Sequence, residues 1–548
     1  MSLTFRRSWL NAMCAIDFYK LGHRPMYPKN TDFVFSNWTA RSTKHFPAVE
    51  GFFDGRHLLI GTQGFVTEFM DHLFEDTFFN QPKEIAIDSF LEDIEMATGK
   101  AADREWVESL YELRYLPISV KALPEGTQVP AGVPDALFDN TLPGYGHLVN
   151  YIETIWSSGN WRTTTVATIA LQYRRILEHY AKATGTPLEF VDWQGHDFAF
   201  RGLSDPYAAA GQLGHAAVFR GSDTFPVIQY ANAYYRPEGK KKFVIGSVQA
   251  SEHSVMCMGT KGNEEETVRR IFTEVVPDGV CSIVGDTWNY WDFNDMLIKY
   301  ADEIKSRPAD ATGLSKVVSR PDSGNPADII CGFPYLSIHH PKMDIAQKIT
   351  MTQEQGYEYF YSVESDTMFK IVTMAGEFNA VPVEKRAVWG AVEQLWNGFG
   401  GTLTPKGYKQ LDSHIGVIYG DSITPHRAVE IMERLMEKGF ASGNVVLGIG
   451  SYTYQYITRD TLGYAIKATA GIVDGELREV FKDPITDDGS KKSATGLISV
   501  VDTTEGLKIT DKVTLEQYHT NGAMREIFRD GKVILVEDWE TIRSRIEV

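Results

Sequence analysis

The sequence has few cysteines and lacks any long apolar run. Its 548 residues include only four cysteines, Cys14, Cys257, Cys281 and Cys331, and their spacing matches no metal-binding pattern. Such sparse cysteine is typical of a reducing compartment, so we expect a cytoplasmic protein. The start of the chain is a poor signal peptide, because its apolar stretch is short and interrupted. No stretch approaches the ~20 apolar residues that span a bilayer, so we expect no membrane partner.

Basic residues are also few relative to acidic ones. The chain has 54 Lys and Arg against 72 Asp and Glu, a formal net charge of −18, so bulk electrostatics oppose binding to nucleic acid. An anionic substrate would therefore need a local cluster of basic side chains. The sequence has no low-complexity tract and no His-rich ligand pattern, which argues against a metal-dependent barrel hydrolase.

A repeating strand–helix rhythm begins near Glu189. Short apolar runs end in polar or glycine-bearing residues, and a helical segment follows each, at spacings of roughly 30 residues, the length of a βα unit. Such units imply parallel strands, and seven or eight of them favour a barrel over the alternative, a doubly wound open sheet. The run Tyr464–Lys467 is either an eighth strand or an edge strand. The strand ends are His196–Phe198, Phe219–Asp223, Ile245–Ser247, Val284–Asp286, Ser319–Asp322, Ile418–Asp421 and Leu447–Gly450.

We therefore predict an α/β fold, an irregular (β/α) barrel with a second α+β domain made from the N-terminal and C-terminal segments. Alternation and turn signals at 116–138 indicate antiparallel strands in that second domain. The expected boundaries are 1–150 and 475–548 for the α+β domain and 151–474 for the barrel. Asp322 and Asp421 are 99 positions apart, about 60 more than a βα unit needs, so residues 327–385 are expected to form an insertion.

The loop Arg320–Pro326 carries the strongest chemical signal. It follows a β-branched run, and its two prolines and Gly324 prevent it from continuing a strand. Arg320 offers a planar fork of donors for phosphate or amide oxygen, and Asp322 offers acceptors for sugar hydroxyls or hydrated Mg²⁺. Taken alone, the loop could equally be a structural turn.

Four acids stand at strand ends, and four carboxylates in one pocket would repel each other unless they met cations or hydroxyls. Mg²⁺ and a polyhydroxylated sugar would meet that need. The acids are Asp223, Asp286, Asp322 and Asp421, and the basic residues that could bind phosphates are Arg201, Arg320, Arg459, Lys467 and Lys482.

Other candidate site residues each have two interpretations when taken singly. Gly420 and the Gly448–Gly450 segment would let backbone N–H groups approach a phosphate, although a tight turn explains them as well. His253 is either a satisfied histidine or an oriented base and nucleophile. Phe198 is either core packing or a platform for a flat ligand.

Taken together, the motifs resemble those of the nicotinamide phosphoribosyltransferases, which are type II phosphoribosyltransferases. The resemblance runs from about Asp17 to the C-terminus, except for residues 327–385. The motifs are Asp17-Phe-Tyr-Lys20, Val120–Gly126, Tyr151–Ile155, His196–Gly202, Gly221–Thr224, Ser251–Ser254, Arg320–Pro326, Gly420-Asp421, Thr458–Asp460 and Phe481–Pro484.

The resemblance implies a homodimer with two sites at its interface. It implies that nicotinamide and phosphoribosyl pyrophosphate give nicotinamide mononucleotide and pyrophosphate in NAD salvage. ATP would be a co-substrate acting through a phosphohistidine, with Mg²⁺ near the phosphates and Asp322 or Asp421 as its carboxylate ligand. The implied catalytic residues are His253, Asp286 and Asp322.

The resemblance also assigns the binding residues. Phe198 and Tyr19 of the partner subunit would hold the pyridine ring, Asp223 would accept the carboxamide N–H, and Arg320 would meet the ring or the amide oxygen. The remaining substrate-binding residues are Ser247, Gly420 and Asp421, with Arg201, Gly450 and Ser451 at the 5′-phosphate. The residues that would bind pyrophosphate or the phosphates of ATP are Arg41, Arg459, Lys467 and Lys482. The segment Gly448–Tyr452 has a shorter glycine run than the family often has, so we expect the phosphate cradle to differ in detail.

Two alternatives stay open. A nicotinate phosphoribosyltransferase shares the fold and the sugar chemistry, and Asp223 argues against it because a carboxylate repels a carboxylate substrate. A non-catalytic binding protein would have no need of His253 beside these acids.

Overall fold

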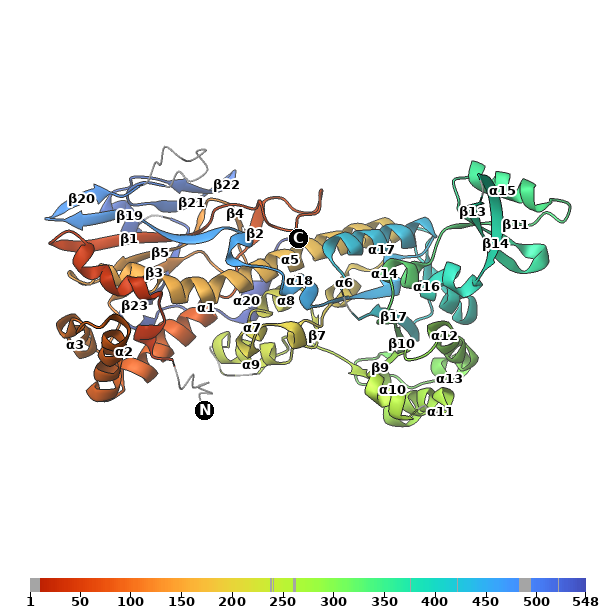
Figure 1. Cartoon of the computed structure of the whole chain (residues 1–548), viewed down its shortest axis with the longest axis horizontal. Coiled ribbons are helices and arrows are strands. Elements are labelled where there is room, and N and C mark those ends of the chain that lie inside the picture. Colours follow the sequence, from red (N-terminus) through yellow and green to blue (C-terminus); the bar gives the residue numbers. More distant parts are fainter. Residues whose placement is uncertain are drawn as a thin grey trace.

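The computed structural model describes residues 10–236, 239, 241–259, 263–374, 376–420, 422–481, 494–520 and 522–548. The molecule is elongated, with an antiparallel sheet at one end and a parallel sheet at the other, as Figure 1 shows. Helix α5 (Glu153–Thr184) runs between them and contributes to one continuous apolar core that reaches both ends. Within the described residues, no helix has the length and apolar character needed to cross a membrane.

The parallel sheet is the barrel that the strand–helix rhythm predicts. All its pairings are parallel, and Gly221 of one edge strand bridges Gly246, just before the other edge strand. Two backbone hydrogen bonds, Ser222 N to Gly246 O and Gly246 N to Arg220 O, reinforce that closure. The strands, in spatial order, are β7 (Gly221–Ser222), β6 (Gly195–Asp197), β18 (Val445–Ile449), β17 (Ile415–Tyr419), β10 (Ser315–Arg320), β9 (Gly279–Val284) and β8 (Gln249–Ala250).

The helices of the barrel follow their strands in the chain. They include α9 (Pro226–Tyr234), α10 (His253–Gly259), α11 (Glu264–Arg270), α12 (Tyr290–Lys299), α14 (Pro326–Cys331), α16 (Lys385–Phe399), α17 (Pro425–Glu437) and α18 (Ser451–Tyr454). Every residue of β17 is buried, as expected for a parallel strand covered on both faces.

The antiparallel sheet joins the two ends of the chain, so the predicted fold class is confirmed. Its strand order is β20 (Glu476–Glu479), β19 (Tyr464–Val473), β1 (Thr31–Ala40), β5 (Pro134–Asn140), β3 (Ile118–Ala122), β23 (Arg525–Arg529) and β24 (Lys532–Val533). The run at Tyr464 thus belongs to this sheet, where β19 pairs with β1, and adds no eighth strand to the barrel.

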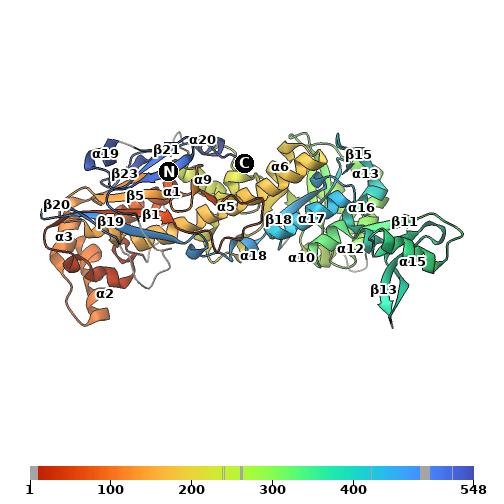
Figure 2. The same ribbon diagram turned by 90° about the horizontal axis from the view of Figure 1, so that it is seen from above.

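C-terminal elements cover one face of this sheet. They are the hairpin of β21 (Ser499–Thr503) and β22 (Gly506–Thr510) and the short helix α19 (Leu515–Thr520). Leu497, Ile498 and Tyr518 pack on Phe35 and Leu137 of the sheet. Helices α2 (Ser89–Thr98) and α3 (Arg104–Leu113) lie at the same end of the molecule (Figure 2).

Residues between α14 and α16 form a small sheet of their own, which projects from the barrel end in both views (Figures 1 and 2). Its strands are β11 (Tyr335–Ile338), β12 (Tyr359–Ser362), β13 (Thr367–Met374) and β14 (Glu377–Val383), and α15 (Ile345–Glu354) packs against it. Helices α14 and α16, at the margins of the expected insertion, pack with barrel residues in the main core.

Candidate active site

The predicted site residues of the barrel lie where its strands end. Parallel strands place their carboxyl ends at one edge, so residues far apart in sequence meet there. Phe198, Asp223 and Gly420 follow directly on β6, β7 and β17, and Asp286 and Asp322 come two positions after the ends of β9 and β10. This is the arrangement that the sequence predicts.

His253 lies between two of the predicted acids. Its Nε2 is 3.6 Å from Asp286 Oδ1 and 3.9 Å from Asp322 Oδ2, while its Nδ1 is 3.0 Å from the Thr287 hydroxyl. Asp286 is almost fully buried, and its Oδ2 accepts the backbone N–H of Asp322 at 3.0 Å. The other oxygen, Oδ1, is buried without a hydrogen-bond partner. Because it faces His253 Nε2, a small movement of the imidazole would complete a hydrogen bond that fixes its tautomer.

Arg320 is fixed against the loop that carries His253. Its guanidinium donates to the backbone oxygen of Ser251, and the Ser251 hydroxyl accepts the N–H of Val284 at 3.0 Å. Burial lowers the pKa of Arg320, and the charges of Asp322, Asp223 and Asp286 oppose that shift. The group remains a cation at neutral pH, because its ordinary pKa is far above 7. The Nε of Arg320 is buried without a partner in the structure.

Gly420 lets the backbone pass close to the side chains of Asp322 and Arg320. A Cβ at Gly420 would lie 2.9 Å from Asp322 Oδ1 and 3.8 Å from Arg320 Cδ. A larger residue would therefore displace the Asp322 carboxylate.

Asp223 is an ionised carboxylate held by two donors. Its Oδ1 lies 2.9 Å from His196 Nε2 and also accepts the Ser247 hydroxyl. Burial raises the pKa of Asp223, but the interactions with His196, Ser247 and the charge of Arg320 outweigh it, so the pKa lies below its ordinary value. The second oxygen, Oδ2, is therefore the one available to a ligand's N–H.

Phe198 lies beside this carboxylate. Its ring centroid is 4.6 Å from that of His196, and a Cβ at Gly448 would lie 2.9 Å from the Phe198 ring, so only glycine leaves the ring in this place. Buried Asp197 holds the two strand ends together, because it accepts Ser222 Oγ at 3.2 Å and Thr224 Oγ1 at 2.7 Å.

Arg201, Gly450 and Ser451 also come together. Arg201 lies on the short turn Phe200–Gly202, and Gly450 caps α18, which begins at Ser451. A Cβ on Gly202 would lie 2.1 Å from Ser451 Oγ, so the two loops are in direct contact.

A family model described as the nicotinate phosphoribosyltransferase (NAPRTase) family matches residues 193–532. The chain belongs to this family.

Two relatives named nicotinamide phosphoribosyltransferase and one solved structure are similar to most or all of the chain. A nicotinamide phosphoribosyltransferase of Acinetobacter baylyi is 42% identical over 98% of this chain and 97% of its own length. One of Mycoplasma pneumoniae is 29% identical over 87% of this chain and 93% of its own length. A crystal structure of nicotinate-nucleotide pyrophosphorylase from Pyrococcus furiosus aligns with a TM-score of 0.49 and 12% identity, over 100% of this chain and 97% of that one.

Several predicted residues lie apart from the barrel strand ends. Tyr19 is on the exposed turn Phe18–Gly22, which Lys20 anchors to Glu153 at the first turn of α5. Arg41 follows β1 and donates to Gly463 O at 2.7 Å, and Lys467 is on β19 opposite Asn37 of β1. Arg459 is exposed on the turn Arg459–Thr461, 3.3 Å from Asp460. Asp421 and Lys482 are outside the described residues.

The sequence reasoning overlooked two side chains of this site. Thr287 contacts His253, and His196 contacts Asp223. A signal was available for both, because Thr287 follows Asp286 directly and His196 precedes Phe198 by two positions.

The carboxylates do not form a cage for a metal ion. Among the described residues, no group of three or more His, Cys, Asp or Glu is arranged to hold one. Mg²⁺ commonly takes one or two carboxylates and completes its shell with phosphate oxygens and water. Asp322, which is partly exposed beside His253, fits that limited role.

Proposed function

We propose that this chain is a nicotinamide phosphoribosyltransferase of NAD salvage. It joins nicotinamide to phosphoribosyl pyrophosphate and releases nicotinamide mononucleotide and pyrophosphate. The observation that carries this assignment is the ionised Asp223, which offers a free carboxylate oxygen beside the Phe198 ring. The close similarity to a relative named for this activity supports it.

The pyridine ring lies on Phe198. Tyr19 of the partner subunit closes the other face, since Tyr19 is exposed on the turn Phe18–Gly22, which Lys20 ties to the first turn of α5. Asp223 Oδ2 accepts the carboxamide N–H, and Ser247 and His196 keep Oδ1 occupied so that the carboxylate cannot turn. Arg320 meets the amide oxygen or the ring face.

The sugar phosphate lies across the strand ends from the ring. Asp322, Gly420 and Asp421 hold the ribose hydroxyls, and Arg201, Gly450 and Ser451 surround the 5′-phosphate. Pyrophosphate lies with Arg41, Arg459, Lys467 and Lys482, contributed in part by the partner subunit. Mg²⁺ on the substrate phosphates, with Asp322, neutralises charge when bound.

In the transfer step, the lone pair of the nicotinamide ring nitrogen forms a bond to ribose C1. The bond from C1 to the pyrophosphate oxygen breaks, and pyrophosphate leaves with the electron pair. Positive charge that develops on the ribose is stabilised by the nearby carboxylates, and negative charge on the leaving group is stabilised by the basic side chains. Holding the ring in line supplies the rest of the rate enhancement.

His253 couples the reaction to ATP. After the small movement of the imidazole that brings Nε2–H onto Asp286 Oδ1, now 3.6 Å away, the Nδ1 lone pair attacks the γ-phosphorus while ADP departs with the electrons of the broken bond. The contact of Nδ1 with Thr287 keeps that nitrogen oriented beforehand.

We infer a homodimer with shared sites, located in the cytoplasm. The exposure of Tyr19 and the separation of Arg41 and Lys467 from the barrel support the shared sites. All four cysteines are free thiols, which fits a reducing compartment.

A reconstitution assay tests this function. Purified protein, Mg²⁺, phosphoribosyl pyrophosphate and nicotinamide should give pyrophosphate and nicotinamide mononucleotide in equal amounts. Arg320→Lys should abolish most of this activity, because it loses the planar fork, whereas Arg386→Lys, on a surface ion pair of α16, should not. Absence of both products from the wild-type protein would refute the proposal.

A further inference from the structure

A second cavity lies at the opposite end of the molecule, between the antiparallel sheet and its C-terminal cover. Its volume is about 230 Å³, and none of the candidate active-site residues lines it. The walls come from β3, β5, β21, α19 and β23. The residues that bear on its chemistry are Lys121, Leu137, Ile498, Val500, His519, Met524, Glu526 and Arg529.

Lys121 is a half-buried cation without an ion pair. Its ammonium donates to Tyr518 O at 2.8 Å and lies 4.0 Å from the centre of the Tyr518 ring, and no carboxylate of the described residues lies within ion-pair distance of it. Burial lowers the pKa of Lys121, and Arg529 lowers it further, while Asp139 and Glu526 oppose the shift. A buried cation left in this state costs free energy that an anion would recover.

A second cation faces the same space. Arg529 pairs with Glu526 at 2.7 Å through one edge of its guanidinium, and Glu526 also accepts Ser119 Oγ at 2.9 Å. Asp139 is committed to the Tyr518 hydroxyl. The carboxylates nearby are thus already bonded, and the cations left to meet an anion in the cavity are Lys121 and the other edge of the Arg529 guanidinium. Burial lowers the pKa of the neighbouring His519, so its ring adds no full positive charge at neutral pH.

The remaining wall is apolar. Leu137, Ile498, Val500 and Met524 line the cavity together with its basic side chains, and Leu137 is the cross-strand neighbour of Lys121. An inorganic ion would leave these side chains without a contact, whereas a compact organic group attached to an anion would pack on them.

We propose that this cavity binds a small organic anion, in which a carboxylate or phosphate meets Lys121 and Arg529 and a compact apolar part packs on Leu137, Ile498, Val500 and Met524. The site is separate from the barrel. A cross-strand row of Lys121, Leu137, Asn37 and Lys467 connects it to the phosphate-binding residue proposed on β19, about 14 Å away at the usual strand spacing.

Calorimetric titration of the full-length protein tests the site with three probes, benzoate, phenyl phosphate and inorganic phosphate. Benzoate and phenyl phosphate separate the carboxylate from the phosphate source, and inorganic phosphate reports the contribution of the apolar wall. The variants are Lys121→Met and Arg529→Gln, with Lys508→Met on the exposed hairpin as the matched control. Arg320→Ala reports binding in the barrel. A melting curve for each variant checks that it folds.

We expect at least one organic probe to bind the wild type, Lys508→Met and Arg320→Ala alike, and to lose affinity about tenfold or more in Lys121→Met. Arg529→Gln should weaken the same probe, and this variant carries the comparison if Lys121→Met does not fold. The proposal is overturned if no organic probe binds the wild type, if both cavity variants bind as tightly as Lys508→Met, or if Arg320→Ala removes the binding. None of these results depends on catalysis, so they leave the proposed transferase activity to its own assay.

Discussion

At the residue scale, the site combines side chains that are individually unremarkable. His253 lies within 4 Å of two acids, and Asp223 is held by a histidine and a serine. We propose that their common location at the strand ends gives them their chemistry, because it joins a carboxylate that would bind an amide, a cation that would bind an anion and an imidazole that would accept a phosphoryl group.

His253→Ala should remove the stimulation by ATP before it removes the basal transfer. The imidazole is the proposed phosphoryl acceptor, whereas the ring and the sugar are held by other residues. The measurement is the initial rate of pyrophosphate release with and without ATP. His426→Ala, an exposed histidine of α17, is the control and should keep the full ATP effect. Stimulation that survives in His253→Ala would show that the phosphohistidine assignment is wrong.

Sequence reasoning reached most of this site because its signals are local. Arg320, Asp322 and Gly324 stand in one rigid loop, and each acid follows an apolar run. Contacts between distant side chains carry no such signal. The interaction of His196 with Asp223 depends on the pairing of β6 with β7, and that of Thr287 with His253 depends on the approach of α10 to the end of β9.

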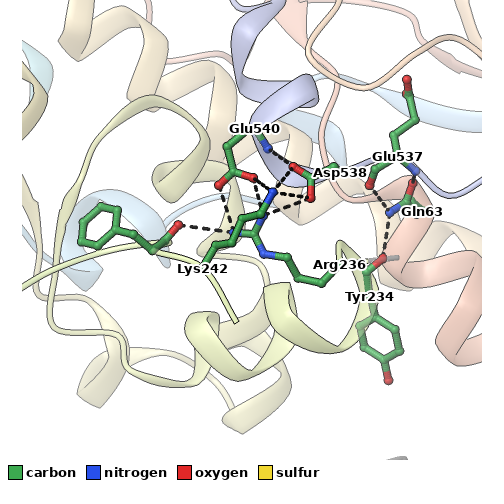
Figure 3. A network of polar contacts seen from close by, with 8 residues as sticks. Gln63, Tyr234, Arg236, Lys242, Glu537, Asp538 and Glu540 are labelled. Carbon is green, nitrogen blue, oxygen red and sulfur yellow. Dashed lines mark hydrogen bonds and ion pairs between the residues drawn. The ribbon is translucent and has the colours of Figure 1, made fainter. Parts of the chain in front are cut away.

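At the element scale, a network of charges fastens the loop after α9 to the C-terminal helix α20 (Trp539–Ser544). Figure 3 shows Arg236 and Lys242 directed at Asp538 and Glu540, and Gln63 directed at Tyr234 and Glu537. The Arg236 side chain is 1% exposed, and it lies 3.3 Å from Asp538. The loop leads to Ser247, so the C-terminal helix helps to place a partner of Asp223.

The double variant Asp538→Asn, Glu540→Gln should destabilise the protein more than Arg236→Leu does. The double variant leaves a buried guanidinium without a carboxylate, which costs about 3 kcal/mol or more. Arg236→Leu leaves carboxylates that water and Lys242 can reach. Asn at 538 keeps the cap on the N–H of Glu540, so the comparison isolates the charge. Urea unfolding measures the free energy of unfolding of both variants. A larger decrease in Arg236→Leu than in the double variant would contradict this explanation.

Because of buried Glu125, the free energy of unfolding should decrease as the pH is raised from about 4.5 to about 7. Burial raises the pKa of Glu125 to about 7 despite its hydrogen bonds with Gly61 N, Gln63 N and Tyr235 OH. The folded state therefore retains a proton that the unfolded chain releases near pH 4.5, so raising the pH through this window favours unfolding by up to about 3 kcal/mol. Urea unfolding of wild type and Glu125→Gln at pH 5, 6, 7 and 8 should show this slope only in the wild type. Equal slopes would exclude Glu125 as its source.

The secondary structure was predictable where one period dominates and ambiguous where it does not. The βα rhythm located most of the barrel strands, because most units have similar lengths. It was wrong at Ile245–Ser247, which comes before the strand β8 and does not end it. The run at Tyr464 carries the same apolar character, yet it pairs with β1, more than 400 positions earlier. Pairing partners at that separation are decided by tertiary packing, which no local pattern encodes.

At the scale of the whole molecule, one chain provides two incomplete halves. The barrel strand ends carry the residues that we propose bind the pyridine ring and the sugar, while Tyr19, Arg41 and Lys467 lie on or near the antiparallel sheet. An antiparallel dimer would bring the sheet of one protomer to the barrel of the other, which is why we propose shared sites.

Mixed dimers test this arrangement. Tyr19→Ala and Arg320→Ala should each be nearly inactive as homodimers. Coexpression should restore about a quarter of wild-type activity, because half the dimers are mixed and each contains one intact site. The measurement is nicotinamide mononucleotide formation by the purified mixture. Activity that stays at the level of the two homodimers would place both residues in the site of a single chain.

The most direct test of the account is substrate choice at Asp223. The ratio of kcat/KM for nicotinamide to kcat/KM for nicotinate should strongly favour nicotinamide in the wild type, because an ionised carboxylate accepts an amide N–H and repels a carboxylate. In Asp223→Ser the ratio should fall by tenfold or more, the equivalent of about 1.4 kcal/mol. A wild-type protein that prefers nicotinate, or a ratio that the substitution leaves unchanged, would contradict the account.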